Sequence, residues 1–473
     1  MVMKNMTTDR IAKACHGRLV NGEASQNREI TGAVIDSRLV EKDYLFFAHK
    51  GEKADGHDYI DAVFEKGALC VVCEKLPEKV NGTCIVVEDT LEALRDIAEF
   101  YRRSLDIKVV GITGSVGKTS TKEFIASVLA QKYEVLKTEG NHNNLVGLPL
   151  TVLRIRDNHE VAVLEMGISE FGEMEKLSEI AHPDICVITN IGDCHLEHLK
   201  DRNGVLKAKT EIFRYMNPNG DVCLFGDDAL LATIKEVNGR DVLFFGQKES
   251  NKVHTVKVNN KGLLGSECVI DNGEEQFGVS VPLPGIHMVN NALAASAVAK
   301  LLAVPVSQIN SGIKNVRSVS GRSNIIQKNG LTIIDDCYNA NPASMRSALD
   351  LLAEAVTPKV AILGDMFEQG ENEKKGHLDV GEYAARKDIE TIVCIGSLSK
   401  DMYERAAAFS RKSKVDYDET VAEAIANLTG FIKKDDTVLV KASNGMGFAR
   451  IIAAITDDNM KNAFDSREEK LFK

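Results

Sequence analysis

The sequence lacks any apolar run that approaches the ~18–20 residues of a membrane-spanning helix, so we expect no membrane partner. Its first ten residues also lack the apolar core of a secretory signal, and the expected location is therefore the cytoplasm. Fixed-period repeats and low-complexity tracts are missing as well. With 44% hydrophobic and 27% charged residues, the composition excludes a disordered or collagen-like chain.

Positive charge is in the minority. The chain has 58 Lys and Arg against 69 Asp and Glu, a formal net charge of −11. This balance argues against nucleic acid as a partner, but it allows a local basic pocket for an anionic substrate. At ~100–200 residues per domain, 473 residues correspond to two to four domains.

Cysteine is too sparse for a disulfide scaffold, since the whole chain has ten. Cys70 and Cys73 form a lone Cys-x-x-Cys inside an apolar stretch, and no second pair follows at zinc-site spacing. Buried reduced thiols are the expected state. Cys194, His195 and His198 would need a fourth tetrahedral ligand that the spacing does not offer, so we expect no zinc site there.

Three stretches of the chain differ in character. Residues 1–104 mix short strand-like runs with glycine-rich turns and end in a predicted helix at 90–103. Residues 105–314 and 315–473 each alternate apolar strands with helical patterns. The predicted strands lie at 44–48, 84–88, 107–112, 161–165, 185–189, 331–335, 360–364, 391–395 and 437–441. We therefore predict an α/β fold of three domains: a small N-terminal α/β domain, a central P-loop-type parallel sheet with flanking helices, and a C-terminal Rossmann-like domain.

The strongest local motif is a glycine-rich segment between the predicted strand 107–112 and a predicted helix at 119–131. It reads Gly-x-x-Gly-x-x-Gly-Lys-Thr and ends in Gly117, Lys118 and Thr119. Such loops wrap backbone N–H groups around phosphates, add a lysine for the β/γ-phosphates and place a hydroxyl on Mg²⁺. The strict pattern requires glycine where Ile112 stands, and the alternative is a simple glycine-rich turn. We predict nucleoside triphosphate binding.

Other polar residues follow the central strands or begin helices. Glu165 closes a buried strand beside the phosphate loop, where a carboxylate can hold Mg²⁺, although an ordinary strand-end glutamate is the alternative. Lys207 and Lys209 lie in a predicted helix at 205–213, where lysines are ordinarily solvated, and nothing in their spacing indicates otherwise. Asn290 or Asn291 could cap a helix that starts near residue 285.

Together these motifs resemble those of the Mur ligases, ATP-dependent enzymes that form amide bonds in peptidoglycan precursors. The resemblance spans essentially the whole chain. Within the family, the sequence is most similar to members that join D-alanyl-D-alanine to UDP-N-acetylmuramoyl-tripeptide. The Asp-Asn-Pro-Arg signature of the diaminopimelate-adding relative is absent. The segments that carry the resemblance are Asp36-Ser-Arg38, Asp55-Gly-His57, Gly140–Pro149, Asp335–Ser344 and Gly364–Glu368.

The resemblance implies roles for individual residues. ATP would be bound by Gly114, Ser115, Gly117, Lys118, Thr119, Ser120, Asn291 at the adenine, Arg322, and Asp336 at the ribose. Mg²⁺ would be held by Thr119, Glu165, His195 and a carbamylated Lys209. The UDP-sugar end would contact Ser37, Arg38, Asp55 and His57, and the muramoyl-peptide path would contain Asn141, Asn143 and Asn144. Lys118, Lys209 and His195 would be the catalytic residues.

The resemblance also assigns a task to each predicted domain. Residues 1–104 would bind the UDP-sugar, residues 105–314 would bind ATP, and residues 315–473 would close on the nucleotide and form the acceptor site. A monomer is expected, with a hinge near residues 312–320. Two positions depart from the family: Met288 stands where asparagine is common, and Asn444 stands where arginine is usual.

Three alternatives remain open. Another amino-acid-adding Mur ligase or a folylpolyglutamate synthase is disfavoured by the Asp-Gly-His and Tyr-Asn-Ala-Asn-Pro segments. A nucleotide-dependent switch that binds a partner protein would need neither second-metal ligands nor a UDP-sugar domain.

Overall fold

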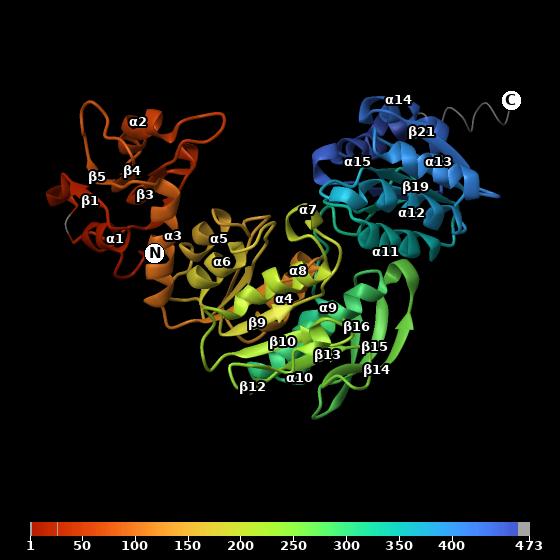
Figure 1. The fold of residues 1–473 in the computed structure, drawn as a ribbon, viewed down its shortest axis with the longest axis horizontal. Helices are drawn as coiled ribbons and strands as arrows, with labels where there is room; N and C mark the ends of the chain where they lie inside the picture. Colours follow the sequence, from red (N-terminus) through yellow and green to blue (C-terminus); the bar gives the residue numbers. More distant parts are fainter. Residues whose placement is uncertain (1, 26, 462–473) are drawn as a thin grey trace.

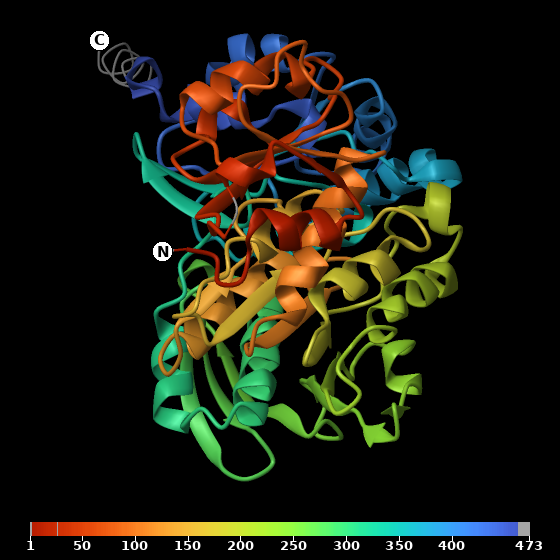
Figure 2. The same cartoon turned by 90° about the vertical axis from the view of Figure 1, so that its left-hand side faces the viewer.

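The computed structural model describes residues 2–25 and 27–461, which form three units built on separate large sheets. In Figure 1 the first unit lies at the upper left and the third at the upper right, with the central unit below and between them. In Figure 2, seen from the left of that view, the first unit stands in front of the third. The three-domain α/β prediction is confirmed. No helix in these described ranges is long and apolar enough to cross a membrane.

The first unit is a five-stranded sheet in the order β1-β5-β4-β3-β2, parallel except for β1. Its strands are β1 (Arg18–Val20), β2 (Gly32–Val34), β3 (Tyr44–Ala48), β4 (Cys70–Cys73) and β5 (Thr83–Val86). Its helices are α1 (Thr8–Ala14), α2 (Ile60–Glu65) and α3 (Thr90–Arg103). Cys70 and Cys73 face opposite sides of β4 in separate core clusters. All ten cysteines are free and buried, which confirms the predicted burial, and their reduced state stays a prediction.

The central unit contains a nine-stranded sheet in the order β16-β15-β14-β13-β10-β9-β6-β8-β7. Its strands from β7 across to β14 in that order are parallel, as the alternation predicts, whereas β15 and β16 extend the sheet in antiparallel fashion, which was not predicted. The strands are β6 (Lys108–Thr113), β7 (Val135–Lys137), β8 (Val161–Glu165), β9 (Ile185–Ile188), β10 (Asp221–Phe225), β13 (Leu243–Gly246), β14 (Val253–Asn260), β15 (Ser266–Asp271) and β16 (Gln276–Val281). A separate small hairpin pairs β11 (Glu236–Val237) with β12 (Arg240–Asp241).

Helices cover both faces of the central sheet because its strands are apolar on both sides. One face packs against α4 (Lys118–Leu129), α9 (Ile286–Leu301) and α10 (Val306–Lys314). The other packs against α5 (Gly147–Val152), α6 (Glu173–Ala181) and α8 (Arg202–Thr210), and this core continues into the first unit through α3. The short helix α7 (Leu196–Leu199) precedes α8.

The third unit is a six-stranded sheet in the order β17-β18-β22-β19-β20-β21, parallel except for β17. The strands are β17 (Asn324–Lys328), β18 (Leu331–Asp335), β19 (Lys359–Gly364), β20 (Thr391–Ile395), β21 (Lys414–Asp418) and β22 (Thr437–Lys441). Helices α11 (Pro342–Ala353), α12 (Glu373–Ala385) and α13 (Ser399–Phe409) cover one face. Helices α14 (Val421–Phe431) and α15 (Ala449–Thr456) cover the other.

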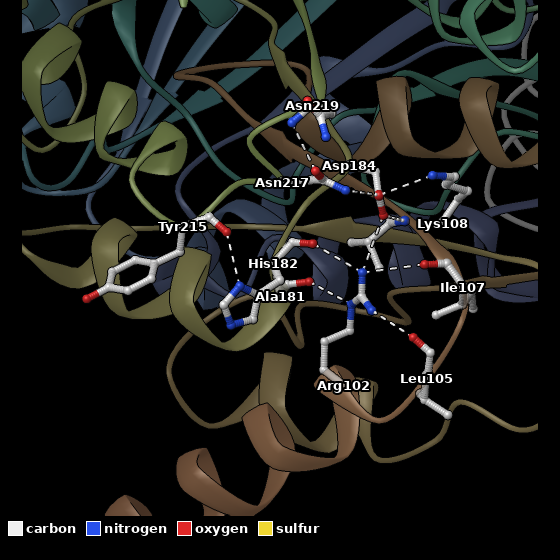
Figure 3. Close-up of polar contacts among 11 residues, drawn as sticks. Arg102, Leu105, Ile107, Lys108, Ala181, His182, Asp184, Tyr215, Asn217 and Asn219 are labelled. Atoms are coloured by element: carbon white, nitrogen blue, oxygen red, sulfur yellow. Dashed lines mark hydrogen bonds and ion pairs between the residues drawn. The ribbon is translucent and has the colours of Figure 1, made fainter. Parts of the chain in front are cut away.

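A buried arginine at the end of α3 ties the first unit to the central one (Figure 3). Arg102 donates hydrogen bonds to the carbonyls of Ala181 (2.9 Å) and His182 (3.1 Å), and its guanidinium lies 3.3 Å from the Asp184 carboxylate. Asp184 also accepts the backbone N–H of Val109 at 2.9 Å. The network lies at the amino ends of β6 and β9 and fixes the turn between α3 and β6.

The predicted hinge at 312–320 is shorter in the structure. Gly312, Ile313 and Val316 are buried against the central unit, and the Gly312 carbonyl accepts the Ser127 hydroxyl at 2.7 Å. Residues 317–320 remain as the connecting segment. Movement about this segment stays a prediction.

Candidate active site

A cavity of about 780 Å³ lies between the central and third units, at the carboxyl ends of the central parallel strands. This edge of a parallel sheet is where α/β proteins bind ligands. Most of the predicted site residues line it: Ser115, Gly117, Lys118, Thr119, Ser120, Asn143, Asn144, Glu165, His195, Asn291, Arg322 and Asp336. The predicted residues that do not line it are Gly114, Asn141, Lys209 and the four residues of the first unit.

The glycine-rich loop joins β6 to α4 in the predicted way. Gly117, at φ +84°, occupies the N-cap position of α4 in the left-handed region, which favours glycine. Lys118 folds back over the loop, and its Nζ donates to the Gly114 carbonyl at 2.9 Å. Desolvation lowers the pKa of Lys118, and the negative charge of Glu165 acts against this shift. The loop thus presents N–H groups and an amine to the cavity.

The end of β9 holds the loop in shape. The Thr189 hydroxyl donates to the Val116 carbonyl at 2.6 Å, and Asn190 Nδ2 donates to the same oxygen at 2.9 Å. Asn190 Oδ1 accepts the Val116 N–H at 3.0 Å. This role of Asn190 was not predicted from the sequence. Its place directly after a buried strand was the available signal, as it was for Glu165.

Replacing Gly114 by alanine should weaken ATP binding by about tenfold or more, because a misplaced loop costs ~1–3 kcal/mol. Gly114 has φ +149°, and an added Cβ would lie 1.9 Å from Thr189 Oγ1, the atom that anchors Val116. Calorimetric titration with a non-hydrolysable ATP analogue measures the effect. Gly278→Ala is the control, since a Cβ added there would meet no heavy atom within 4 Å. Equal affinities in both variants would contradict this reasoning.

One carboxylate oxygen of Glu165 accepts hydrogen bonds and the other accepts none. Its Oε1 accepts the Thr119 hydroxyl at 3.2 Å and Asn143 Nδ2 at 2.9 Å. Its Oε2 is buried without a hydrogen-bond partner, and Lys122 Nζ lies 3.9 Å away. A buried carboxylate oxygen without a hydrogen-bond donor, beside a phosphate loop, fits a hard cation.

Few protein groups are available to hold that cation. Within the described ranges, no cluster of three or more His, Cys, Asp or Glu side chains could hold a metal ion. Mg²⁺ commonly uses one or two carboxylates together with substrate phosphates and waters, so Glu165 and Thr119 suffice as a partial site.

Lys209 is buried, contrary to the ordinary expectation for a lysine on such a helix, from which only the family resemblance departed. It lies in the last turn of α8 and is 1% exposed, whereas Lys207 on the same helix is exposed as predicted. Burial lowers the pKa of Lys209 to about 8, and the positive charge of Lys118 acts in the same direction. Lys209 does not line the cavity. Helical spacing could not reveal its burial because the burying partners are distant in sequence.

The third unit brings a positive and a negative group to the cavity. The Arg322 guanidinium lies over the Tyr338 ring, 4.0 Å from its centre. The Asp336 carboxylate accepts the Ser323 N–H at 2.9 Å and Lys441 Nζ at 2.7 Å. Lys441 is 2% exposed. Neither Tyr338 nor Lys441 was predicted to have a role, although Tyr338 lies within one of the segments that carry the family resemblance.

Asn291 lies inside α9, six residues after the Gly285 N-cap, so it does not cap this helix. Its Oδ1 accepts the Thr121 hydroxyl at 2.9 Å, and its Nδ2 donates to Met288 Sδ at 3.4 Å. The departure at Met288 is thus a buried side chain that orients Asn291. Asn144 Oδ1 accepts the N–H of Gly147, the first residue of α5, at 2.9 Å, and both Asn144 and Asn141 are exposed.

The four predicted residues of the first unit lie away from the cavity, on or beside two short 3₁₀ helices at Ser37–Leu39 and Gly56–Tyr59. Asp36 accepts side-chain hydrogen bonds from Arg38 Nε at 2.9 and 3.1 Å and from Arg38 Nη2 at 2.7 Å. Both ring nitrogens of His57 have partners: Nδ1 lies 2.6 Å from Asp55 Oδ1, and Nε2 accepts the Glu74 N–H at 3.0 Å. His57 therefore orients the Gly56–Tyr59 turn.

Three family models match consecutive parts of the chain. They are described as "Mur ligase family, catalytic domain" (residues 29–102), "Mur ligase middle domain" (112–299) and "Mur ligase, glutamate ligase domain" (321–444). Each match falls on one of the three units.

Relatives match over the full length. The chain is 35% identical to UDP-N-acetylmuramoyl-tripeptide–D-alanyl-D-alanine ligase of Bacillus subtilis, over 95% of this chain and 98% of the relative. A crystal structure of MurF from Acinetobacter baumannii superposes with a TM-score of 0.86 at 31% identity, covering 95% and 98% of the two chains. The MurF ligase of Thermotoga maritima, solved in complex with ADP, gives a TM-score of 0.78 at 28% identity, covering 92% and 98%. By these matches, the chain belongs to the Mur ligase family.

Proposed function

We propose that this chain is an ATP-dependent ligase that joins D-alanyl-D-alanine to the terminal carboxylate of UDP-N-acetylmuramoyl-tripeptide, in cytoplasmic peptidoglycan precursor synthesis. The full-length similarity to the Bacillus subtilis ligase of that name carries the proposal. Ten buried free thiols suit a reducing compartment. The chain would act as a monomer, as the family resemblance implies.

ATP would lie across the cavity, with its phosphates on the loop and its nucleoside toward the third unit. Lys118 would release the Gly114 carbonyl and turn to the β/γ-phosphates. Arg322 and Asp336 would reach the nucleotide from the opposite wall, and Asn291 would face the adenine. Asp336 keeps free lone pairs for a ribose hydroxyl, because each of its oxygens accepts one short hydrogen bond from the protein.

The chemistry requires an activated carboxylate, since a free carboxylate does not react with an amine at neutral pH. The substrate carboxylate attacks the γ-phosphorus, ADP leaves, and an acyl phosphate forms. The amine of D-alanyl-D-alanine then attacks the acyl carbon, and phosphate departs. Several anionic oxygens meet in the first step, and the Lys118 ammonium offsets their repulsion.

Magnesium would be held by Thr119, Glu165, His195 and a carbamylated Lys209, and when bound it supplies positive charge that stabilises the transferring phosphoryl group. The buried Oε2 of Glu165, which accepts no hydrogen bond, supports this assignment. Carbamylation needs a neutral amine to attack CO₂. With its pKa lowered to about 8, Lys209 is neutral far more often at pH 7 than an exposed lysine would be.

The first unit would bind the UDP-sugar, with Ser37, Arg38, Asp55 and His57 near that end and Asn141, Asn143 and Asn144 along the muramoyl-peptide path. The third unit would close over the nucleotide by turning about residues 317–320. Closure would keep water from the acyl phosphate, which it would otherwise hydrolyse.

Phosphate release tests the proposed reaction. With ATP, Mg²⁺ and UDP-N-acetylmuramoyl-tripeptide, we expect release only when D-alanyl-D-alanine is added, together with a pentapeptide product by mass spectrometry. Release with single amino acids or with a folate substrate would assign the chain to a sister ligase or to a folylpolyglutamate synthase. Absence of release with every acceptor would favour a nucleotide-dependent switch.

A further inference from the structure

One ion pair joins the central and third units at the edge of the cavity. His195 Nδ1 lies 2.8 Å from Glu368 Oε2. His195 follows β9 and opens α7, whereas Glu368 follows β19 and is distant in the sequence. The histidine side chain is 21% exposed and the glutamate side chain is 60% exposed. Ion pairs this accessible to solvent contribute little to stability, so this contact does not serve to hold the two units together.

The backbone is shaped to make this contact. His195 has φ +51° and Glu368 has φ +59°, so both residues occupy the left-handed region that non-glycine residues seldom adopt. The two loops also touch through their backbones: a Cβ on Gly370 would lie 3.3 Å from Glu197 Cα. The third unit therefore docks on the α7 loop, with the Glu368 carboxylate 2.8 Å from Nδ1 of the His195 ring.

The ring nitrogen that contacts the carboxylate determines whether the second ring nitrogen can bind a metal ion. When Nδ1–H donates to a carboxylate, the neutral imidazole keeps its lone pair on Nε2. Metal-binding histidines almost always donate their second ring N–H to a carboxylate, a carbonyl or water, which fixes both the tautomer and the ring orientation. In a histidine without such a partner, neither the tautomer nor the ring orientation is fixed.

We propose that Glu368 is a positioning residue that, only when the third unit is docked, orients His195 so that Nε2 is ready to ligate the divalent cation. The inference rests on the proposed function, in which His195 is a metal ligand, and goes beyond it by making the cation site depend on a residue of the third unit. Cation binding and domain docking then favour each other, because each stabilises the same arrangement of the histidine.

Glu368→Ala tests this in the full-length protein. We expect the affinity for Mn²⁺, measured by electron paramagnetic resonance with a non-hydrolysable ATP analogue bound, to fall roughly 10–100-fold. Glu368→Gln should lose less, because its amide oxygen can still accept Nδ1–H. Glu371→Ala is the matched control, since Glu371 lies in the same loop and is exposed.

A spectroscopic readout separates positioning from simple loss of stability. The ¹⁵N signals of the His195 ring are identified by their loss in His195→Gln. In the wild type the ring should carry its proton on Nδ1. In Glu368→Ala the proton should shift toward Nε2. An Mn²⁺ affinity within twofold of the wild type, or a proton that stays on Nδ1, would overturn the inference. Both measurements can be made without the amide-forming reaction taking place. If the wild type fails the phosphate-release test, the proposed function falls, whereas these measurements still decide the role of Glu368.

Discussion

Lys209→Ala is expected to slow ligation by roughly 10²–10³-fold or more, the loss typical when a group that stabilises transition-state charge is removed. Lys209 is buried, and the proposed carbamate would convert its amine into an oxygen ligand for the cation. The ATP affinity should change little, because the loop around Gly114 and Lys118 is built without Lys209. Steady-state phosphate release and calorimetric ATP titration measure the two effects.

Lys207→Ala is the matched control, since Lys207 lies on the same helix but is exposed. It should keep nearly full activity. Wild-type activity in Lys209→Ala would exclude the carbamate, and loss of ATP binding in parallel would indicate a misfolded site.

The lowered pKa of Lys209 also gives the carbamate a pH dependence. With a pKa of about 8, about one-tenth of the amine is neutral at pH 7 and about half at pH 8. Enzyme stripped of CO₂ should therefore regain activity about fivefold faster at pH 8 than at pH 7, at equal dissolved CO₂. A rate independent of pH would show that the Lys209 amine is not the group that reacts.

Arg102→Met should lower the free energy of unfolding by about 3–5 kcal/mol, as expected when one member of a buried ion pair is removed. Methionine keeps much of the apolar stem but leaves the carbonyls of Ala181 and His182 without their donor. Asp184 keeps Val109 N–H but loses its buried countercharge. Chemical denaturation, followed by circular dichroism, measures the change.

Arg103→Met provides the control on the next residue. Arg103 has a side chain that is 64% exposed, and its pairing with Glu99 is on the surface. Its loss should change the unfolding free energy by no more than about 0.5 kcal/mol. Equal effects from the two variants would mean that the buried network of Figure 3 has no special weight.

The fold was predictable at several strands where burial on both faces leaves an uninterrupted apolar run. The predicted strands at 161–165, 331–335, 391–395 and 437–441 coincide with β8, β18, β20 and β22. The buried strands β4 and β10 were missed despite such runs, whereas other missed strands are of another kind. In β15 and β16, buried and more exposed residues alternate, which is a weaker pattern in six residues. Strand β17 has no buried residue at all, so its pairing with β18 depends on contacts that the local sequence does not encode.

The features of the candidate site also fall into those that the sequence could predict and those that it could not. The phosphate loop was predictable because its function depends on neighbouring residues, from Gly114 to Thr119. Burial of Lys209, the anchoring of the loop by Asn190 and the contact between His195 and Glu368 depend on residues that meet only after folding. For most residues, the roles drawn from the family resemblance are consistent with a position at the cavity. Both ring nitrogens of His57, however, already have hydrogen-bond partners within the first unit.

The connection between the central and third units acts as a very short tether. Four residues, 317–320, extend to at most ~14 Å. Arg322 follows this tether by two residues, so it can never drift far from the phosphate loop while the chain is intact. Its local concentration at the nucleotide stays high, on the millimolar scale typical of short linkers. Lengthening this segment with flexible residues would therefore dilute Arg322 without changing a single contact in the closed state.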